Sequence, residues 1–477
     1  IGVTLAGARD AGPSAAAPPV TFNCTLDAAC PAITVAGDPF ATIGPGPAPF
    51  RGYGDPDLTY DPSSGTLWLT YSWLDVLISD PGPPPVIDWG VRTHLARSDD
   101  NGATWTYAGS LNETTPISHP DTAEDGWTIH EVSALLLEPS GGWQALWLTY
   151  FELLGETGVE DRSDFYYART LGAAPGDLGG TVTPWVRGYG TSASFGAVHD
   201  LSLLTQLTDC FTFTEPALFA HGGETYLSTN CVVIDESGRR DDLERLVLLG
   251  EEAVGYSYVG ELLTYADAVD LGATRVEQAD IFFSRDGSVL LIATPIVTGG
   301  VPEHLGCVVF EITDIAAAEV GRDPAGDAVQ LAWITADDPV IGPGACTYDP
   351  ASDTGVLMHV HDFTLDPFDM EFTVRATGVH PAADNDGDTW TDVEETLIGT
   401  DPATACGYTP GGAPHSDSWP PDLIESDDIN IFDVLALKAD FAQTVPPASS
   451  RFDLAVSGTI NIFDVLALKP DFGSSCS

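Results

Sequence analysis

One hairpin-like pattern recurs five times along this chain and constrains its fold more than any other feature. The first copy, at residues 53–72, reads YGDPDLTYDPSSGTLWLTYS, two runs of aromatic and β-branched residues around a Pro/Gly turn. Such runs are typical of β-hairpins. Similar segments occupy residues 131–151, 215–231, 280–294 and 345–360, about 60 to 85 residues apart. The pattern predicts a mainly β protein built from repeated antiparallel units.

Repetition at this period is typical of β-propellers, in which each four-stranded blade buries its faces against its neighbours. We therefore predict a five-bladed β-propeller over residues 46–380. Residues 1–45 form a low-complexity segment rich in Ala, Gly and Pro. If that segment is ordered, we expect it to dock on the propeller or on a neighbouring subunit, giving a homo-oligomer. A calcium-binding loop at 381–405 and a dockerin-like helical pair at 406–477 are expected to complete the chain.

The charge balance excludes several classes of partner. The chain has 71 acidic and 17 basic residues, a net charge of −54. Such a surface repels nucleic acids and anionic membranes, and it needs salt or divalent cations to screen its self-repulsion. No apolar run is long enough to span a bilayer. A saline habitat and a calcium-loaded extracellular protein both fit this composition, and most of the carboxylates are expected to be solvated surface groups.

The eight cysteines indicate an oxidising compartment. None lies in a CxxC or Cys/His metal pattern, and an even count without such patterns favours disulfides in a secreted or cell-surface protein. Free buried thiols are the weaker alternative. Proximity in sequence favours four pairs: Cys24–Cys30, Cys210–Cys231, Cys307–Cys346 and Cys406–Cys476.

A short motif between the first two hairpins supports the propeller. Ser98, Asp100, Gly102, Thr104 and Trp105 fit the pattern Ser-x-Asp-x-Gly-x-Thr-Trp. Asp100 can cap its own turn, Gly102 supplies a permissive dihedral angle, and the Trp side chain can pack between strands. The segment resembles the Asp box of sialidase-type propellers. In those families the motif is structural and faces away from the active site, so the resemblance implies the fold and no catalytic role.

An acidic loop follows the last hairpin and is the most specific motif in the chain. Carboxylates occupy loop positions 1, 3, 5, 9 and 12, and a backbone carbonyl is available at position 7. Hard oxygen donors at this density suit Ca²⁺, which takes six to eight oxygen ligands. The stretch resembles a thrombospondin type 3 or EF-hand-like loop, although its glycine stands at position 4. An acidic linker is the alternative. The expected ligands are Asp384, Asp386, Asp388, Trp390, Asp392 and Glu395.

The C-terminal region contains two near-identical segments, at 429–438 and 460–469. They resemble a dockerin, which is a pair of loop–helix calcium repeats. In the calcium-binding loop of each repeat, position 1 is an aspartate (Asp422 and Asp453), whereas positions 3 and 5 carry no carboxylate. This loss is expected to weaken calcium binding substantially. Apolar residues recur on each predicted helix (Val434, Leu435, Leu437 and Val465, Leu466, Leu468), a stripe more typical of a helix–helix core than of a cohesin-binding face.

Three carboxylates are candidates for an active site. In a propeller the first residue of each innermost strand points into the central funnel. Aligning the hairpins places Asp55, Glu131 and Glu215 there in the first three blades. Five-bladed arabinan- and xylan-cleaving glycosidases, which this arrangement resembles, use an Asp general base, a second acid that tunes pKa and orients substrate, and a Glu general acid. The resemblance is best around residues 54–56 and 214–219.

Other features leave the function open. The last two blades offer Ala279 and Pro343 instead of acids, while Asp57 competes with Asp55, and His130 with Glu131, for the inward position. Carboxylates before proline also cap turns. The main interpretation is therefore a calcium-stabilised extracellular protein with a structural, adhesive or carbohydrate-binding role, acting on a polysaccharide, a cell surface or its own copies. The alternative is a glycoside hydrolase.

Overall fold

The computed structural model separates into two compact units, Thr21–Val320 with Ala332–Ala382, and Ile1–Val20 with Gly321–Leu331 and Ala383–Ser477. Among the described residues no helix is long and apolar enough to cross a membrane. The structure describes residues 20–24, 30–38, 50–80, 86–88, 90–118, 125–153, 165–178, 183–187, 199–233, 244–283, 288–297, 303–323, 325–335, 343–349, 354–361, 370–377, 386, 388, 390–391, 394–395, 398–405, 418–424, 426–445, 447–455 and 459–475.

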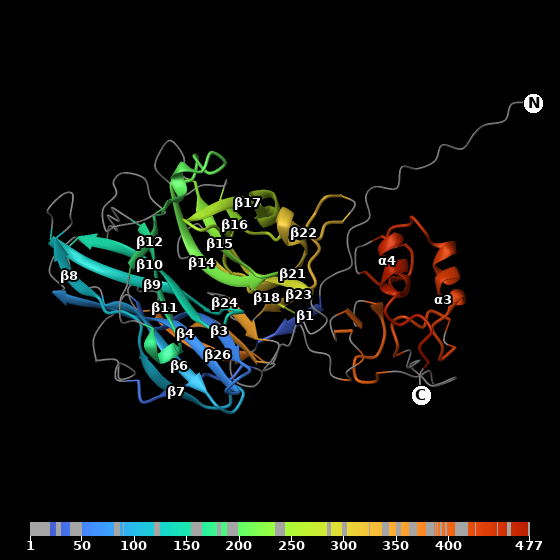
Figure 1. Cartoon of the computed structure of the whole chain (residues 1–477), viewed down its shortest axis with the longest axis horizontal. Helices are drawn as coiled ribbons and strands as arrows, with labels where there is room; N and C mark the ends of the chain where they lie inside the picture. Colours follow the sequence, from blue (N-terminus) through green and yellow to red (C-terminus); the bar gives the residue numbers. More distant parts are fainter. Residues whose placement is uncertain are drawn as a thin grey trace, which may run out of the picture. The chain divides into compact units, whose positions relative to one another are not determined.

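The first unit is a β-propeller of antiparallel sheets (Figure 1). One sheet runs in the order β14-β15-β16-β17: β14 (Thr212–His221), β15 (Glu224–Val232), β16 (Arg245–Glu251) and β17 (Tyr256–Leu263). A second runs β13-β12-β11-β10-β9-β8: β8 (Thr115–Ser118), β9 (Asp125–Leu137), β10 (Trp143–Leu153), β11 (Phe165–Gly172), β12 (Thr183–Arg187) and β13 (His199–Asp200).

The other two sheets have strands from both ends of the unit. The third contains β1 (Val20–Asn23), β18 (Arg275–Phe283), β19 (Val289–Val297), β20 (Glu303–His304), β21 (Cys307–Asp314), β22 (Glu319–Val320) and β23 (Ala332–Thr335). The fourth contains β2 (Val35–Ala36), β3 (Phe50–Asp61), β4 (Thr66–Asp80), β5 (Val86–Asp88), β6 (Val91–Ser98), β7 (Trp105–Ser110), β24 (Gly344–Asp349), β25 (Thr354–His361) and β26 (Met370–Thr377). Here β26 pairs in parallel with β3, which joins the last strands to the first hairpin.

All five predicted hairpins form, as β3–β4, β9–β10, β14–β15, β18–β19 and β24–β25. The first strand of each hairpin contacts the first strand of the next, and β24 contacts β3. These five inner strands therefore close a ring around a central axis. The core lies between sheets, where large side chains such as Tyr71, Trp73 and Trp147 are fully buried.

The turn at Asp100 forms as its sequence predicts. The Asp100 carboxylate accepts hydrogen bonds from the Thr104 backbone N–H at 2.8 Å and from the Ser98 hydroxyl at 2.7 Å. Gly102 has a φ of +79°, and Trp105 is buried. These contacts connect β6 to β7 at the outer edge of a sheet, away from the inner strands.

The described part of the N-terminal segment lies on the propeller of its own chain. Strand β2 pairs in parallel with β7, and β1 borders β23. The Arg375 side chain donates to the Cys30 carbonyl at 3.1 Å, which ties this segment to β26 as well.

Three of the four expected disulfides are present: Cys24–Cys30, Cys210–Cys231 and Cys307–Cys346. The second joins the segment preceding β14 to β15, and the third links β21 to β24. The fourth pair, Cys406 and Cys476, lies outside the described residues.

The C-terminal unit holds two short helices, α3 (Ile431–Ala436) and α4 (Ile462–Ala467), each begun by an Asn cap and a capping box. Backbone hydrogen bonds cross between the repeats, for example from Ala442 N–H to the Ile460 carbonyl at 2.7 Å. The predicted core stripe divides: Leu437 and Leu468 are buried, but Leu435 and Leu466 are 52% and 51% exposed. Assigning Leu435 and Leu466 to the core was wrong, because the helices are too short to bury two faces.

Candidate active site

The inner strands share one irregularity. The antiparallel register shifts between Gly54 and Asp57 on β3, Thr214 and Ala217 on β14, Glu277 and Asp280 on β18, and Gly344 and Thr347 on β24. Each shift holds a non-glycine residue with positive φ: Asp55 (43°), Glu215 (53°), Gln278 (50°) and Ala345 (46°). A bulge redirects a side chain, and left-handed backbone costs about 1–3 kcal/mol and gathers at functional sites. At four equivalent positions of the ring, a bulge therefore redirects one side chain.

These four positions meet at a small pocket on the axis. The pocket has a volume of about 30 Å³ and is lined by Asp55, Glu215, Gln278 and Ala345, together with Asp57 and Asp280. Of the residues expected at the fourth and fifth inner strands, Ala279 lines the pocket beside Gln278, whereas Ala345 lines it in place of Pro343. The bulge between Gly344 and Thr347 shifts the strand register there, which an alignment of the hairpin sequences does not show.

Asp55 has the properties of a tuned acid–base group. Burial raises its pKa to about 7, and the charge of Glu131 adds to the shift. Hydrogen bonds oppose this rise, one of them from the Gln278 amide, whose Nε2 lies 3.4 Å from Asp55 Oδ1. Glu131 therefore acts electrostatically on Asp55, although it is not among the residues lining the pocket.

Asp57 lines the pocket beside Asp55, whereas His130 is not among the lining residues. Asp57 accepts a hydrogen bond from the backbone N–H of Leu135 and so ties β3 to β9. Its pKa is raised well above the usual range, by burial and then by the charge of Asp280. The His130 side chain is buried, with Nδ1 2.9 Å from Thr149 Oγ1, and burial lowers its pKa to about 4. It is a neutral group inside the sheet.

Asp280 is a second tuned carboxyl that sequence reasoning missed. Burial raises its pKa to about 6, while the Thr347 hydroxyl donates to it at 2.7 Å. Asp55-Pro56 and Glu215-Pro216 share an acid–proline pair that marks their bulges in the sequence, but Gln278 precedes alanine and carries no such signal.

Part of the predicted calcium loop is described. One carboxylate oxygen each from Asp386, Asp388 and Glu395 lies within 4.8 Å of the others. Glu395 is fully buried, and the Asp388 carboxylate accepts the Trp390 N–H at 2.9 Å. A set made only of hard oxygen donors at this spacing fits Ca²⁺. Asp384 and Asp392 lie outside the described residues.

The repeat loops differ from this one. Both Asp422 oxygens accept backbone N–H groups of their own loop, from Ser426 and Asp427. Asp464 likewise accepts from the N–H groups of Ala455 and Asn461. These buried carboxylates stabilise the loop backbone through hydrogen bonds.

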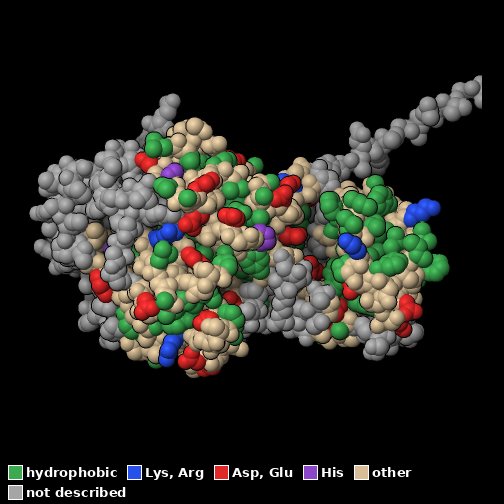
Figure 2. Space-filling model, viewed as in Figure 1, with side chains coloured by type: hydrophobic (Ala, Val, Ile, Leu, Met, Phe, Trp, Pro, Cys, Tyr) green, Lys and Arg blue, Asp and Glu red, His purple; other side chains and the backbone are tan. Residues whose placement is uncertain are grey.

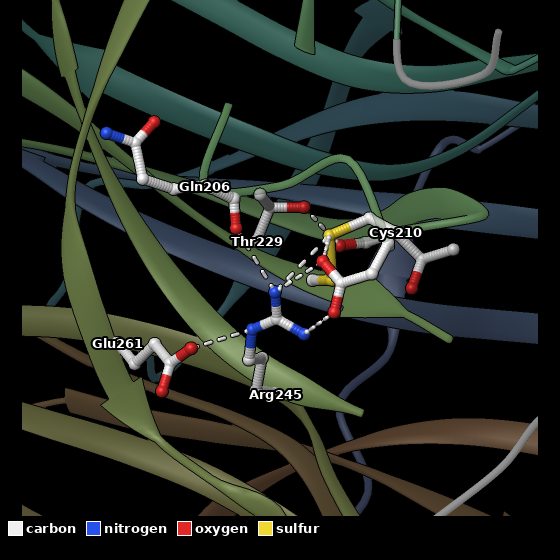
Figure 3. Close-up of a disulfide and its surroundings, with 8 residues drawn as sticks. Gln206, Cys210, Thr229, Arg245 and Glu261 are labelled. Atoms are coloured by element: carbon white, nitrogen blue, oxygen red, sulfur yellow. Dashed lines mark hydrogen bonds and ion pairs between the residues drawn. A yellow bond between two sulfur atoms is a disulfide. The ribbon is translucent and has the colours of Figure 1, made fainter. Parts of the chain in front are cut away.

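A second group of potential ligands, Asp209, Cys210 and Cys231, is already engaged (Figure 3). The two cysteines form a disulfide, and Arg245 pairs with Asp209 at 2.8 Å and with Glu261 at 2.8 Å. Arg245 therefore stabilises the hairpin β14–β15 together with its disulfide, and this cluster is structural.

No protein-family model and no curated protein matches the chain. Among solved structures, it is similar to Zg3597, a family 117 glycoside hydrolase of Zobellia galactanivorans, with 12% identity, a TM-score of 0.42, and coverage of 70% of this chain and 86% of that one. It is also similar to an α-L-arabinofuranosidase of Lactobacillus brevis, with 11% identity, a TM-score of 0.38, and coverage of 68% and 90%. Because these scores lie below 0.5, the propeller rests on the strand pairing of this chain itself.

Proposed function

We propose that the propeller is a glycoside hydrolase acting on an extracellular polysaccharide. The observation that carries the proposal is the meeting of Asp55 and Glu215 on one axial pocket. They come from different inner strands, each on a strained bulge, and the pKa of Asp55 is displaced to about 7. Glycoside hydrolysis needs two carboxyl groups in different protonation states, which different environments provide.

The roles follow the resemblance to the five-bladed glycosidases. Asp55 is the general base: with a pKa near 7 it is a stronger base than an ordinary carboxylate and still ionises near neutral pH. Glu215, across the pocket, is the general acid that protonates the leaving oxygen. Glu131 holds the pKa of Asp55 high, and Gln278 orients the Asp55 carboxylate through its hydrogen bond.

The same proposal includes a five-bladed architecture and an extracellular location. The closed ring of five inner strands supports the blade count, with the fourth sheet divided into two blades where β26 meets β3. The disulfides support an oxidising compartment. The hydrogen-bonded turn at Asp100 supports the resemblance to an Asp box.

Substitution Glu215→Gln tests the function. In a screen of arabinans, xylans and other extracellular polysaccharides, the wild-type chain should release reducing sugar. Glu215→Gln should lower kcat by about 10²- to 10⁴-fold, because the amide cannot donate the proton. Glu224→Gln, an exposed residue at the start of β15, is the matched control and should retain activity. Loss of activity in both variants, or in neither, would remove Glu215 from the mechanism.

We also propose that the loop at residues 384–395 binds one Ca²⁺ and that the two repeat loops bind none. The convergence of Asp386, Asp388 and Glu395 supports the first part. The absence of carboxylates at positions 3 and 5 of both repeat loops supports the second. Trp390 packs in the core of the C-terminal unit, so the ion would stabilise that unit through the loop.

The C-terminal unit favours a second candidate function, self-association. Its two repeats expose equivalent large apolar side chains, and Figure 2 shows apolar side chains gathered on this unit. We name this set the paired apolar face; each member is between 48% and 61% exposed: Ile431, Phe432, Leu435, Phe441, Ile462, Phe463, Leu466 and Phe472. The chain's only two lysines, Lys438 and Lys469, are exposed at the ends of the same helices. A second copy of this strongly acidic chain is the partner that complements them.

Sedimentation velocity tests this association. The wild-type chain should form a concentration-dependent dimer, and the double variant Phe432→Ser/Phe463→Ser should weaken it at least about tenfold, as expected for central apolar anchors. Leu171→Ser and Leu203→Ser, which change exposed leucines of the propeller unit, are the controls. A wild-type chain that stays monomeric, or a double variant that dimerises equally, would contradict the assignment.

A further inference from the structure

The fifth inner strand brings a disulfide to the wall of the candidate active site. Ala345 on β24 occupies the bulge position that Asp55 holds on β3, but its side chain carries no functional group. The next residue, Cys346, also lines the pocket, and it is bonded to Cys307 at the start of β21. Of the three disulfides that the structure describes, only this one has a cysteine among the pocket-lining residues.

The backbone of this bulge is strained. Ala345 has a φ of +46°, in the left-handed region that is unfavourable for residues with a Cβ. It has neither the freedom of glycine nor the short polar side chain with which Asp and Asn stabilise this conformation locally. A strained residue of this kind persists only where the surrounding structure holds it in place. The bulge therefore needs a restraint from outside its own strand.

The restraint comes from the neighbouring blade. The Ala345 N–H donates to the Thr294 hydroxyl on β19 at 2.9 Å. Thr294 Oγ1 also lies 3.6 Å from Cys307 Sγ, so this hydroxyl packs against the disulfide. Thr294, Cys307 and Cys346 are each at most 2% exposed, so these contacts form away from bulk water. The disulfide is the covalent part of the restraint, because it joins the bulge of β24 directly to β21.

The restrained segment also carries a hydrogen bond to a carboxyl group of the pocket. Thr347, the residue after Cys346, donates its hydroxyl to Asp280 at 2.7 Å and accepts the Leu58 N–H at 3.1 Å. Burial raises the pKa of Asp280, and the Thr347 hydroxyl opposes that rise. A displacement of β24 would therefore move one wall of the pocket and weaken a hydrogen bond that favours the ionised form of Asp280.

We propose that the Cys307–Cys346 disulfide is a positioning element of the candidate active site, which holds the strained backbone of Ala345 and keeps Thr347 against Asp280. Its role is geometric, and its sulfur atoms take no part in making or breaking bonds of the substrate. The effect of the disulfide on catalysis rests on the proposed hydrolase function. Its effect on the backbone of β24 does not, and that effect can be measured without a substrate.

Hydrogen exchange of the full chain measures the restraint directly. Removing the disulfide by Cys307→Ala/Cys346→Ala should speed exchange in β24 at least about tenfold, because the bulge loses its covalent tie to β21. The strands of the third blade, β14–β17, should keep their protection. Cys210→Ala/Cys231→Ala is the matched control, since it removes a disulfide whose cysteines do not line the pocket. This control should speed exchange in β14 and β15 and leave β24 unchanged.

Ala345→Gly separates positioning from general stabilisation. Glycine adopts positive φ without strain, so it needs less restraint at this position. Added to the variant that lacks Cys307 and Cys346, it should slow exchange in β24 about two- to fivefold. A glycine at an unstrained position would instead speed exchange, because it adds backbone freedom. Thr294→Val keeps the disulfide but removes the acceptor of the Ala345 N–H, so it should also speed exchange in β24. If the cysteine variant fails to fold, Thr294→Val carries the same test.

Activity assays add the catalytic part. On a substrate found in the polysaccharide screen, Cys307→Ala/Cys346→Ala should lose kcat about 10- to 100-fold at a temperature where it stays folded. Cys210→Ala/Cys231→Ala should retain its activity. Unchanged exchange in β24 for the cysteine variant and for Thr294→Val would overturn the proposal, as would faster exchange on adding Ala345→Gly. A wild-type chain that hydrolyses no polysaccharide would contradict the hydrolase function alone, and the exchange comparison would still decide what the disulfide holds.

Discussion

Replacing Asp55 by asparagine is expected to abolish hydrolysis and, at the same time, to stabilise the fold above pH 7. Burial and the charge of Glu131 raise the Asp55 pKa from 3.8 to about 7 in the folded chain. Folding therefore favours the protonated form of Asp55. The stability that the protonated carboxyl contributes is fully present below about pH 4 and is lost as the pH rises through 7. The asparagine side chain does not ionise, so it avoids that loss, but it cannot act as a base.

The two effects have different sizes. The difference of 7 − 3.8, about three pKa units, corresponds to at most about 4 kcal/mol of unfolding free energy at high pH. Asp55 keeps part of its surface exposed to solvent, which screens its charge, so the measured gain should be smaller. The loss of kcat should be about 10²- to 10⁴-fold, as for other general bases.

Thermal melting at pH 5 and at pH 8, combined with activity assays, measures both effects. Asp55→Asn should raise the melting temperature at pH 8 by more than at pH 5, where only about one of the three pKa units of destabilisation (5 − 3.8) has developed. Glu131→Gln should give part of the same gain, because it removes the repelling charge. Asp61→Ala is the contrasting control: Asp61 accepts the Ser63 N–H at 2.8 Å in the turn of the same hairpin, and alanine removes that acceptor, so this variant should be destabilised. A lower melting temperature for Asp55→Asn at pH 8 would show that Asp55 is a structural residue.

The hairpins could be predicted from the sequence because they depend on local chemistry. Aromatic and β-branched runs around Pro/Gly turns specify where each inner strand pairs with its neighbour. The bulges could not be predicted as a set, since they depend on how five strands crowd around one axis. Gln278 is the clearest example: no local signal marks it, yet it occupies the position equivalent to Asp55 and hydrogen-bonds to that residue.

In the C-terminal repeat pair, the secondary structure could be predicted but the burial of the side chains could not. Its helices and their Asn caps are evident from two copies of one motif. Periodicity alone could not decide which apolar residues are buried, because two one-and-a-half-turn helices bury only one stripe each. Leu437 is buried whereas Phe432, five positions earlier, is 61% exposed. A cavity of about 670 Å³ between the ends of the five inner strands could not be predicted from the sequence either, because those strand ends are distant along the chain.

Removing calcium is expected to loosen the C-terminal unit and to leave the propeller folded. Trp390, in the loop that we propose to bind Ca²⁺, packs with Ile398, Leu423 and Leu437 in the core of that unit. Without the ion, the carboxylates of Asp386, Asp388 and Glu395 repel one another at short range. An ion present at 100 times its Kd stabilises the state that binds it by about 2.7 kcal/mol.

Hydrogen exchange of the full chain, with calcium and with chelator, resolves the two units within one experiment. Chelation should increase exchange in the loop and in α3 and α4, whereas β14–β17 should keep their protection. Asp388→Asn should exchange as the chelated wild type does and should not respond to added calcium. The asparagine keeps an acceptor for the Trp390 N–H, so this variant removes a charge and a metal ligand while preserving the loop hydrogen bond.

Asp422→Asn separates the acidic loop from the repeat loops. Asp422 holds the N–H groups of Ser426 and Asp427, so its replacement should weaken the first repeat with or without calcium. The response of that variant to calcium should nevertheless match the wild type. If Asp388→Asn still responds and Asp422→Asn does not, the ion binds in the first repeat. The direction of this single comparison decides which of two acidic loops holds the C-terminal core together.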